Sequence, residues 1–535
     1  MMKKRITVLS LLPLLAACAA EPDNSGETEA PQNNEENNNA EEAADPDALN
    51  VAMQADVNSL DPHFGNDHPS LNVKRTIFDT LVKTDENLDL SMSLAESFEQ
   101  VEPEVWEIQL KEGIQFHDGN ELTADVVKMN VDRMLNPDVA STMAFMFDMI
   151  TDVEVVDNYT VRLTTEYPFA PLRQHFAHPA GQMVSPDVLQ EDLAAMENGE
   201  QPGSVINENP VGTGPYQFVS QEPGERIELE ANPDYFADGP GAETLTFTIV
   251  PEDLTRVGEL ETESSQIIGH LNPDDIERVE ENEETDVARY DSASLAYFGF
   301  NTEKAPFDDP DVRRAVAMAV NKEEIVEGAA AGAAIPAEGP LAPPVFGSAE
   351  ELDPIPYDPE GAQELLQEAG YEDGFSVELW SDDSRTRLDT AELLQGQLSA
   401  VGIDVDIESM EAGVHRERVS EGEHEMFLGS WGTVTGDADY GLYPVFHSDS
   451  FGMTGNRTFF ANDEVDQLLE AGRREMDEAA RLELYEEAQQ IIVDEAPLVP
   501  LYHTEHLAGL RSDLQNFYIH PSSLYELTET TRTMD

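Results

Sequence analysis

The chain has 535 residues, well above the typical domain size of about 100 to 200 residues, so we expect two or three packed units. It carries 110 acidic residues against 29 basic residues, and the resulting formal charge of -81 excludes nucleic acid as a partner. Because the acidic residues are scattered between apolar segments along the whole chain, we interpret most of them as the solvated surface of an acidic, halophilic type of secreted protein, in which salt screens the self-repulsion.

The N-terminus has the pattern of an export signal. Basic residues at 3–5 precede an apolar run over residues 6–17, which is too short to span a bilayer. The run ends in LAAC at Cys18, the only cysteine of the chain, and this ending resembles the bacterial lipobox. We expect residues 1–17 to be a signal peptide and Cys18 to be acylated. The alternative is a small-residue cleavage site that happens to contain a cysteine.

Residues 18–46 are expected to form a disordered acidic linker behind the lipidated cysteine. From residue 19 to residue 46 there is no Val, Ile, Leu, Met or aromatic residue, so this stretch cannot bury a core. Once Cys18 is acylated the folded part has no cysteine, which excludes disulfides and thiol catalysis.

Folded sequence begins near Leu49 and mixes short strands with helices. Alternating apolar residues over 106–110 predict a half-buried strand, and Thr123 is a predicted N-cap for the helix that follows it. Turn residues at 157–158 and 223–224 lie between alternating runs, and they predict two hairpins.

The later half alternates strands and helices more regularly. Asp-Pro pairs at 309–310 and 358–359 predict helix starts, and Gly370 and Gly402 stand where helices should end. The strand-like runs between these helices are residues 375–380, 403–407 and 426–430. This alternation is typical of a doubly wound α/β sheet.

Several segments, in a fixed order, resemble the family 5 extracellular solute-binding proteins, which bind oligopeptides, dipeptides, glutathione and nickel chelates. The segments are LDPH at 60–63, the block from LAESFE to LTADVV at 94–127, NPVGTGPYQFV at 209–219, NPDYF at 232–236, the block from FGFNTEKAPF to NKEEIV at 298–326, YDPEGAQELLQEAGY at 357–371 and SWGTVTGDADYGLYPVFHS at 430–448. The resemblance covers the chain from about residue 50 to about residue 505.

The resemblance implies an α/β fold of the class II periplasmic-binding-protein type, with two lobes joined by two hinge crossings and an extra subdomain in the first lobe. The expected parts are lobe I at 47–93, 206–297 and 503–535, its subdomain at 94–205, and lobe II at 298–502. The chain would cross near Phe298–Asn301 and return near Pro497–Tyr502, so Asp535 should end in lobe I.

The segment after the strand predicted at 426–430 is the main candidate for a binding site. Ligands of open α/β sheets bind beyond the carboxyl ends of the strands. The segment combines carboxylates, aromatic rings, hydroxyls and glycines, which suit the capture of an amine-bearing ligand. The predicted ligand contacts are Trp431, Thr433, Thr435, Asp437, Asp439, Tyr440 and Tyr443.

The resemblance also implies roles for individual residues. Peptide-binding members pair the ligand's α-ammonium with an Asp that resembles Asp437, and Asp439 is the alternative because the loop here is shorter than in dipeptide-binding relatives. Arg385 and Arg387 occupy the region where those relatives place a guanidinium for the ligand's carboxylate. The alternative for these two arginines is surface pairing with neighbouring aspartates.

No motif of the sequence predicts catalysis, a cofactor or a metal site. We find no nucleophile elbow, Ser-x-x-Lys motif or phosphate-binding loop. The histidine pairs His503 and His506, and His175 and His178, have no third ligand spaced nearby.

We therefore interpret the chain as the lipid-anchored substrate-binding component of an ABC importer, on the outer face of the cytoplasmic membrane. It would be a monomer that captures a dipeptide, oligopeptide or glutathione-like ligand between its lobes and delivers it to the permease subunits. Three alternatives stay open: a binder of a nickel chelate or another small solute, a receptor that reports occupancy to a sensor, and a secreted hydrolase that uses Asp437 and Asp439 as an acid and base pair. Residues two apart on a strand point to opposite faces, which disfavours the hydrolase.

The charge generates a prediction about stability. The melting temperature of the folded protein should rise with added salt, because screening weakens the repulsion among uncompensated negative charges. Thermal melts at low and at high salt measure this effect. A melting temperature that stays flat or falls across the series would remove the interpretation as a protein of a saline habitat.

Overall fold

The computed structural model describes residues 47–65 and 67–533. The predicted signal peptide, Cys18, the acidic linker and Asp535 lie outside these residues. Within the two described ranges, no helix has both the length and the apolar character that crossing a bilayer requires.

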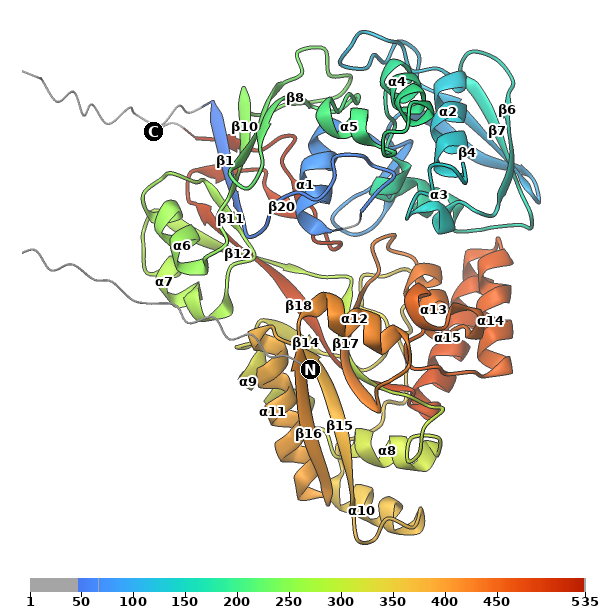
Figure 1. Cartoon of the computed structure of the whole chain (residues 1–535), viewed down its shortest axis with the longest axis vertical. Coiled ribbons are helices and arrows are strands. Elements are labelled where there is room, and N and C mark those ends of the chain that lie inside the picture. Colours follow the sequence, from blue (N-terminus) through green and yellow to red (C-terminus); the bar gives the residue numbers. More distant parts are fainter. Residues whose placement is uncertain (1–46, 66, 534–535) are drawn as a thin grey trace, which may run out of the picture. The chain divides into compact units, whose positions relative to one another are not determined.

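The elements alternate along the chain (Figure 1). The strands are β1 (Ala48–Met53), β2 (Val82–Thr84), β3 (Leu90–Met92), β4 (Ala95–Glu102), β5 (Val105–Leu110), β6 (Ile150–Val155), β7 (Thr160–Thr165), β8 (Tyr216–Glu222), β9 (Arg226–Ala231), β10 (Thr244–Ile249), β11 (Ile267–Gly269), β12 (Thr285–Asp291), β13 (Ser294–Phe300), β14 (Ala334–Pro336), β15 (Phe375–Asp382), β16 (Ile403–Met410), β17 (Met426–Gly432), β18 (Leu498–Arg511), β19 (Leu514–Gln515), β20 (Tyr518–Ile519), β21 (Tyr525–Glu526) and β22 (Thr531–Arg532). The helices are α1 (His68–Ile77), α2 (Ala124–Met134), α3 (Leu172–Ala177), α4 (Pro186–Glu197), α5 (Ser204–Glu208), α6 (Asp253–Glu261), α7 (Ile276–Glu280), α8 (Pro310–Met318), α9 (Lys322–Ala329), α10 (Pro359–Glu368), α11 (Arg385–Ala400), α12 (Ala412–Ser420), α13 (Ala438–Phe446), α14 (Asp463–Arg474) and α15 (Glu478–Glu495), with one-turn helices η1 (Ala144–Met146), η2 (Pro179–Gly181), η3 (Pro273–Asp275), η4 (Ser448–Ser450) and η5 (Gly452–Thr454).

Most local sequence signals are confirmed, and Thr123 stands at the N-cap of α2 but its side chain makes no capping hydrogen bond. The predicted strand at 106–110 lies in β5, and the two predicted hairpins are the β6–β7 and β8–β9 pairs. The two Asp-Pro pairs start α8 and α10, where each aspartate accepts a hydrogen bond from a backbone N–H of the first turn. Gly370 and Gly402 follow the ends of α10 and α11 with φ +92°, a left-handed conformation that glycine adopts without strain.

One sheet runs through most of the chain, and β18 is its centre. The strand order is β16-β15-β17-β13-β18-β11-β1-β10-β9-β8, and β12 and β14 also pair with β18. The first part of β18 pairs with β13 and β14, and its later part pairs with β11 and β12 (Figure 1). We call residues 47–65, 67–291 and 505–533 lobe I and residues 294–504 lobe II. The α/β fold class is confirmed.

The crossings between the lobes differ from the predicted ones. The first lies at Ser292–Ala293, between β12 and β13, and the second lies inside β18 between Thr504 and Glu505. The reason is that the apolar run of β13 is one strand, paired with β17 over its whole length. A hinge at Phe298–Asn301 would divide that ladder, so the crossing lies before the strand.

A second sheet, of order β4-β5-β7-β6, lies in the region where the subdomain of lobe I was expected. Its strands and α2 bury one side in the largest apolar core, in which the ring of Trp106 packs edge to face on Phe98 with centroids 5.6 Å apart. Such aromatic pairs stabilise a core beyond the area that they bury.

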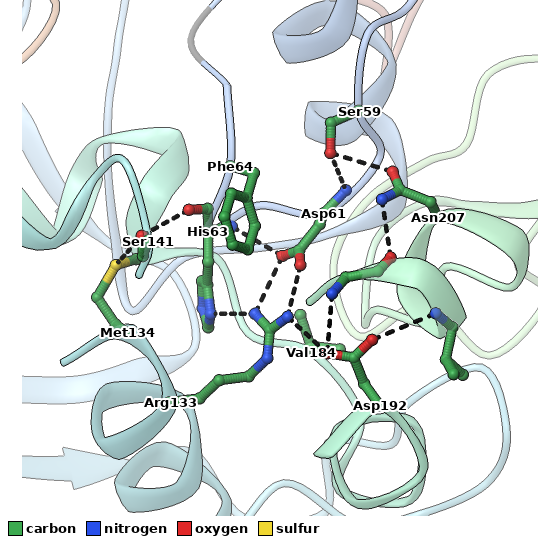
Figure 2. A network of polar contacts seen from close by, with 12 residues as sticks. Ser59, Asp61, His63, Phe64, Arg133, Met134, Ser141, Val184, Asp192 and Asn207 are labelled. Carbon is green, nitrogen blue, oxygen red and sulfur yellow. Dashed lines mark hydrogen bonds and ion pairs between the residues drawn. The ribbon is translucent and has the colours of Figure 1, made fainter. Parts of the chain in front are cut away.

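A buried ionic network fixes this subdomain to the remainder of lobe I (Figure 2). The guanidinium of Arg133 on α2 donates to both oxygens of Asp61, at 3.2 and 2.6 Å, and to Asp192 on α4 at 2.8 Å. It also donates to Nδ1 of His63 at 2.7 Å, and burial lowers the pKa of His63 to about 3, which keeps the imidazole a neutral acceptor.

The network explains the LDPH segment. Asp61 and His63 belong to it, and the ammonium of Lys74 donates to three backbone carbonyls of the same loop. Two cations therefore face Asp61 and Asp192, so the cluster is close to neutral although its side chains are almost completely buried. Buried charges are stable only when paired and hydrogen-bonded in this way.

Candidate functional site

The directions of the strands bring the carboxyl edges of the two lobes face to face. β18 runs from lobe II into lobe I, and both β17 and β18 run antiparallel to β13, so β17 and β18 point the same way. β15 is parallel to β17, so the carboxyl ends of both strands point toward lobe I. β11 is antiparallel to β18 and parallel to β1, so their carboxyl ends point toward lobe II. The boundary between the lobes is therefore the place where the fold positions ligand-binding loops.

The predicted binding segment of lobe II begins at this edge. Trp431 is near the end of β17, and its indole N–H donates to the carbonyl of Tyr440 at 2.9 Å. The two rings lie 5.6 Å apart, and the backbone N–H of Thr433 donates to the carbonyl of Ala293 at the first crossing. Hydrogen bonds therefore hold the segment together internally and attach it to the first crossing.

The same segment packs on lobe I. Tyr440 is part of the apolar core of lobe I, and Trp431 and Val434 pack against that core. Gly436 has φ +70°, and a Cβ at that position would lie 3.1 Å from the side chain of Leu88 in lobe I. This close approach requires glycine, and it means that the aromatic part of the predicted site lies at the boundary of the lobes.

Asp437 forms a buried ion pair. Its side chain is 0% exposed, and both of its oxygens accept from the guanidinium of Arg481 on α15, at distances from 2.8 to 3.1 Å. It also caps α13 by accepting from the N–H of Asp439 at 2.9 Å. The predicted role as partner of a ligand ammonium stays a prediction, and a ligand would have to compete with Arg481 for this carboxylate.

Asp439 is paired across the boundary. Arg473 on α14 donates to its two oxygens at 3.0 and 3.1 Å, and Nε2 of His175 on α3 of lobe I lies 3.7 Å away. Burial alone would raise the pKa of Asp439, but Arg473 and His175 outweigh burial and hold it well below its usual range. Asp437 and Asp439 were expected on a strand, but they lie at the start of α13.

Arg473 makes further contacts between the two lobes. Its carbonyl accepts from the N–H of Ala170 in lobe I at 2.9 Å. Its guanidinium lies 3.5 Å from the ring centre of Tyr443 and 5.4 Å from that of Phe169. The predicted contact Tyr443 is therefore stacked on an arginine, and Thr433 and Thr435 are buried within the loop.

The two predicted carboxylate partners separate in the structure. The side chain of Arg385 is 76% exposed and pairs with Asp274 of lobe I at 3.2 Å and with Asp389 at 3.7 Å. This arginine is exposed, and its exposed pairs contribute little to stability. Its role as a ligand contact stays a prediction. Arg387 is 23% exposed, pairs with Asp382 at 3.0 Å and donates to Ser430 at 2.9 Å, directly before Trp431.

Three imidazoles lie on the edge of lobe I; sequence reasoning missed His68 and His270 and considered His506 only as half of a metal-binding pair. His68 begins α1 after the loop from β1, His270 follows β11 directly, and His506 lies on β18. The rings of His68 and His270 lie 6.3 Å apart. Burial lowers the pKa of His270 to about 3 and that of His506 to about 4, so both are neutral at neutral pH. The position of His270, directly after the end of β11, which is parallel to β1, was the signal that could have identified it.

Two small hollows lie away from the boundary. One is in lobe II beside Lys322 and Ile492, and the other is in lobe I beside His63 and Gln182. Each has room for little more than a water molecule, so neither can hold a peptide. In the described part of the chain, no group of three or more His, Cys, Asp or Glu side chains is arranged to hold a metal ion.

Comparisons with known proteins agree on one family. A family model described as bacterial extracellular solute-binding proteins, family 5 Middle, matches residues 89–453. The glutathione-binding protein GsiB of Pectobacterium atrosepticum is 33% identical over 493 residues, which cover 90% of this chain and 94% of that protein.

Solved structures are similar over the same length. The ABC transporter-associated periplasmic binding protein DppA from Helicobacter pylori, in complex with the peptide STSA, has a TM-score of 0.79 and 27% identity and covers 91% of this chain and 98% of its own. HbpA2 from Haemophilus parasuis has a TM-score of 0.80 and 25% identity, with coverage of 91% and 100%.

The ion pairs of α13 generate a prediction about stability. Asp437→Asn should lower the free energy of unfolding by about 3 to 5 kcal/mol, because asparagine still caps the helix but leaves Arg481 buried without a counter-charge. Asp439→Asn should lower it less, because the side chain of Arg473 is 16% exposed and keeps its stacking on Tyr443. Urea unfolding of the two variants measures the difference.

Asp383→Asn is the control for these two variants, because Asp383 is exposed beside the same edge. It should change the free energy of unfolding by less than about 0.5 kcal/mol. An Asp437→Asn protein as stable as this control would contradict the importance of the Arg481 pair.

Proposed function

Because the chain belongs to family 5 of the bacterial extracellular solute-binding proteins, we propose that it captures a peptide-like ligand between its two lobes and delivers it to the permease subunits of an ABC importer. The ligand would be a dipeptide, an oligopeptide or a glutathione-like molecule. The protein would act as a monomer, held on the outer face of the cytoplasmic membrane by a lipid on Cys18.

One observation carries this proposal. The carboxyl edges of the sheet in lobe I and in lobe II point at each other. Within residues 47–65 and 67–533, the chain passes between the lobes at two crossings, Ser292–Ala293 and the middle of β18. A ligand held between such edges contacts both lobes at once, so its binding energy favours the closed arrangement over an open one.

The relatives support the choice of ligand class. GsiB is named as a glutathione-binding protein, and the DppA structure holds the peptide STSA. Both ligands carry an amine, carboxylates and amide groups. In lobe II, the aromatic and hydroxyl groups of the Trp431 segment suit such ligands, and Asp437 or Asp439 would pair with the amine. In lobe I, the neutral imidazoles of His270 and His506 can donate hydrogen bonds to, or accept them from, the ligand's amide groups.

The hydrolase alternative is not favoured by the geometry. An acid and base pair needs one carboxyl group that carries a proton. Asp439 is held ionised by Arg473, and Asp437 is neutralised separately by Arg481. Each carboxylate is thus paired with its own arginine, so the two do not form a cooperating acid and base pair.

The proposal predicts binding without turnover. Calorimetric titration of the full chain with glutathione and with trialanine should give saturable binding, and the bound molecule should be recovered chemically unchanged. Maltose should not bind. Nickel-histidine chelate is the probe for the alternative ligand class. Cleavage of the peptide, or binding of the chelate alone, would contradict the proposal.

The same titration tests whether Asp437 or Asp439 binds the ligand's amine. If Asp437 or Asp439 meets the ligand's ammonium, its change to Asn should weaken trialanine about thirtyfold or more and N-acetyl-trialanine much less. Equal loss for both peptides would assign the effect to the fold instead, in line with the arginine pairs.

The lipid anchor predicts a second result. Cys18→Ala should release the protein from membranes, because a lipid would be its only attachment. Fractionation of cells that express the parent and the variant measures this release, and ligand titration of the released protein checks that its folded part is intact. If the variant stays with membranes after a salt wash, the proposed anchor is wrong.

A further inference from the structure

One contact between the lobes lies to one side of β18, where α3 of lobe I faces α13 and α14 of lobe II (Figure 1). Lobe I contributes residues 167–170, directly before α3, and lobe II contributes Arg473 and Arg474 at the end of α14. We call these residues the boundary contact. The two crossings join the lobes through the covalent chain, whereas the boundary contact is non-covalent, so a hinge motion that opens the lobes breaks it.

Arg473 makes the boundary contact with both its backbone and its side chain. Its carbonyl accepts from the N–H of Ala170 at 2.9 Å. Its guanidinium lies 5.4 Å from the ring centre of Phe169, and its Nη1 lies 3.5 Å from the hydroxyl of Tyr167. Arg474 adds a second cation, 5.0 Å from the ring centre of Tyr167. Cations at such distances are attracted to aromatic faces, and the attraction is stronger where water is excluded.

The guanidinium of Arg473 is held in place from within lobe II. Asp439 accepts from its Nε and Nη2 at 3.0 and 3.1 Å, and the ring centre of Tyr443 lies 3.5 Å away. Because Asp439 and Tyr443 belong to the same lobe as Arg473, they present its side chain to lobe I in a fixed geometry. Little side-chain entropy is then lost when the lobes close.

The charge of the chain makes an attractive contact at the boundary useful. Acidic residues outnumber basic residues in each lobe, so the two lobes repel each other as they approach. At the boundary contact, lobe II presents two adjacent arginines, and lobe I presents two aromatic rings and a backbone N–H that pairs with a carbonyl. None of these partners repels a cation, so the boundary contact opposes the repulsion between the lobes.

We propose that Arg473 is a latch that stabilises the closed arrangement of the lobes through Tyr167, Phe169 and Ala170, without contacting the ligand. The inference rests on the proposed function, in which the lobes close around a ligand. The latch contributes the same closing free energy whichever ligand is bound, so it raises the affinity for every ligand by one common factor. A residue that contacts the ligand would instead discriminate between ligands.

Two variants remove the latch from opposite lobes. Arg473→Gln removes the cation. Tyr167→Leu removes the ring and the hydroxyl on lobe I but leaves Arg473 paired with Asp439, so it tests the latch even if Arg473→Gln fails to fold. Arg226→Gln and Tyr357→Leu are the matched controls, because both side chains are exposed and neither belongs to the boundary contact.

Calorimetric titration of the full chain with glutathione and with trialanine measures the common factor. Each latch variant should weaken the binding of both ligands about fivefold, and by the same factor within about twofold. The double variant should lose less affinity than the product of the two single losses, because both changes remove one shared interaction. Both controls should match the parent.

Hydrogen–deuterium exchange without added ligand gives a readout that does not depend on peptide binding. The amide of Ala170 is protected by the carbonyl of Arg473, so its exchange reports the opening of the latch. It should exchange several-fold faster in both latch variants than in the parent, while exchange in β8 and β9 stays unchanged. If this result is found and neither ligand binds to the parent, the proposed function fails and the latch stands.

Three results would overturn the inference. One is a loss of affinity for only one of the two ligands, which would indicate a direct ligand contact. Another is an amide of Ala170 that exchanges in the variants as it does in the parent, because the boundary contact would then not depend on these side chains. The third is faster exchange at Ala170 without any loss of affinity, which would show that the contact does not contribute to ligand capture.

Discussion

The hydrogen bonding of β18 to both half-sheets is the constraint on which the remaining structure depends. A strand of 14 residues pairs with β13 and β14 in lobe II and with β11 and β12 in lobe I. Its direction decides that β17 and β11 end toward each other. The backbone hydrogen bonds of β18 therefore turn the carboxyl edges of the two lobes toward each other, and side-chain pairs such as Arg473 with Asp439 add to them at the boundary.

Because the chain has few basic residues, the partners of its buried arginines show which parts of the fold depend on ion pairs. Arg133, Arg473 and Arg481 are bound to buried aspartates, and each fixes one part of the fold: the subdomain, the lobe boundary and the start of α13. Such pairs are costly to break, because the remaining charge stays desolvated. The same electrostatic rule thus identifies the parts of the fold that buried ion pairs hold in place.

The sequence was sufficient for the fold because fold signals are local. The Asp-Pro helix starts, the glycine stops and the alternating strands depend on neighbours within a few residues, and the resemblance supplied their order. The predicted position of the hinge was wrong because the lobe boundary depends on which strand β13 pairs with, and no local sequence pattern encodes that pairing. Trp431 and Tyr440 were placed at the lobe boundary correctly as a segment, but the partners of Asp437 and Asp439 were not predicted, because Arg481 and Arg473 come from helices 34 or more residues away.

Hydrogen–deuterium exchange of the full chain, with and without saturating glutathione, tests the central claim that the ligand is held between the two facing edges. The account predicts slower exchange on both sides of the boundary, in the segment from Ser430 to Asp439 of lobe II and around His270 of lobe I, together with little change in the outer strands β8 and β9. Protection confined to one lobe, or no protection at either edge, would contradict it.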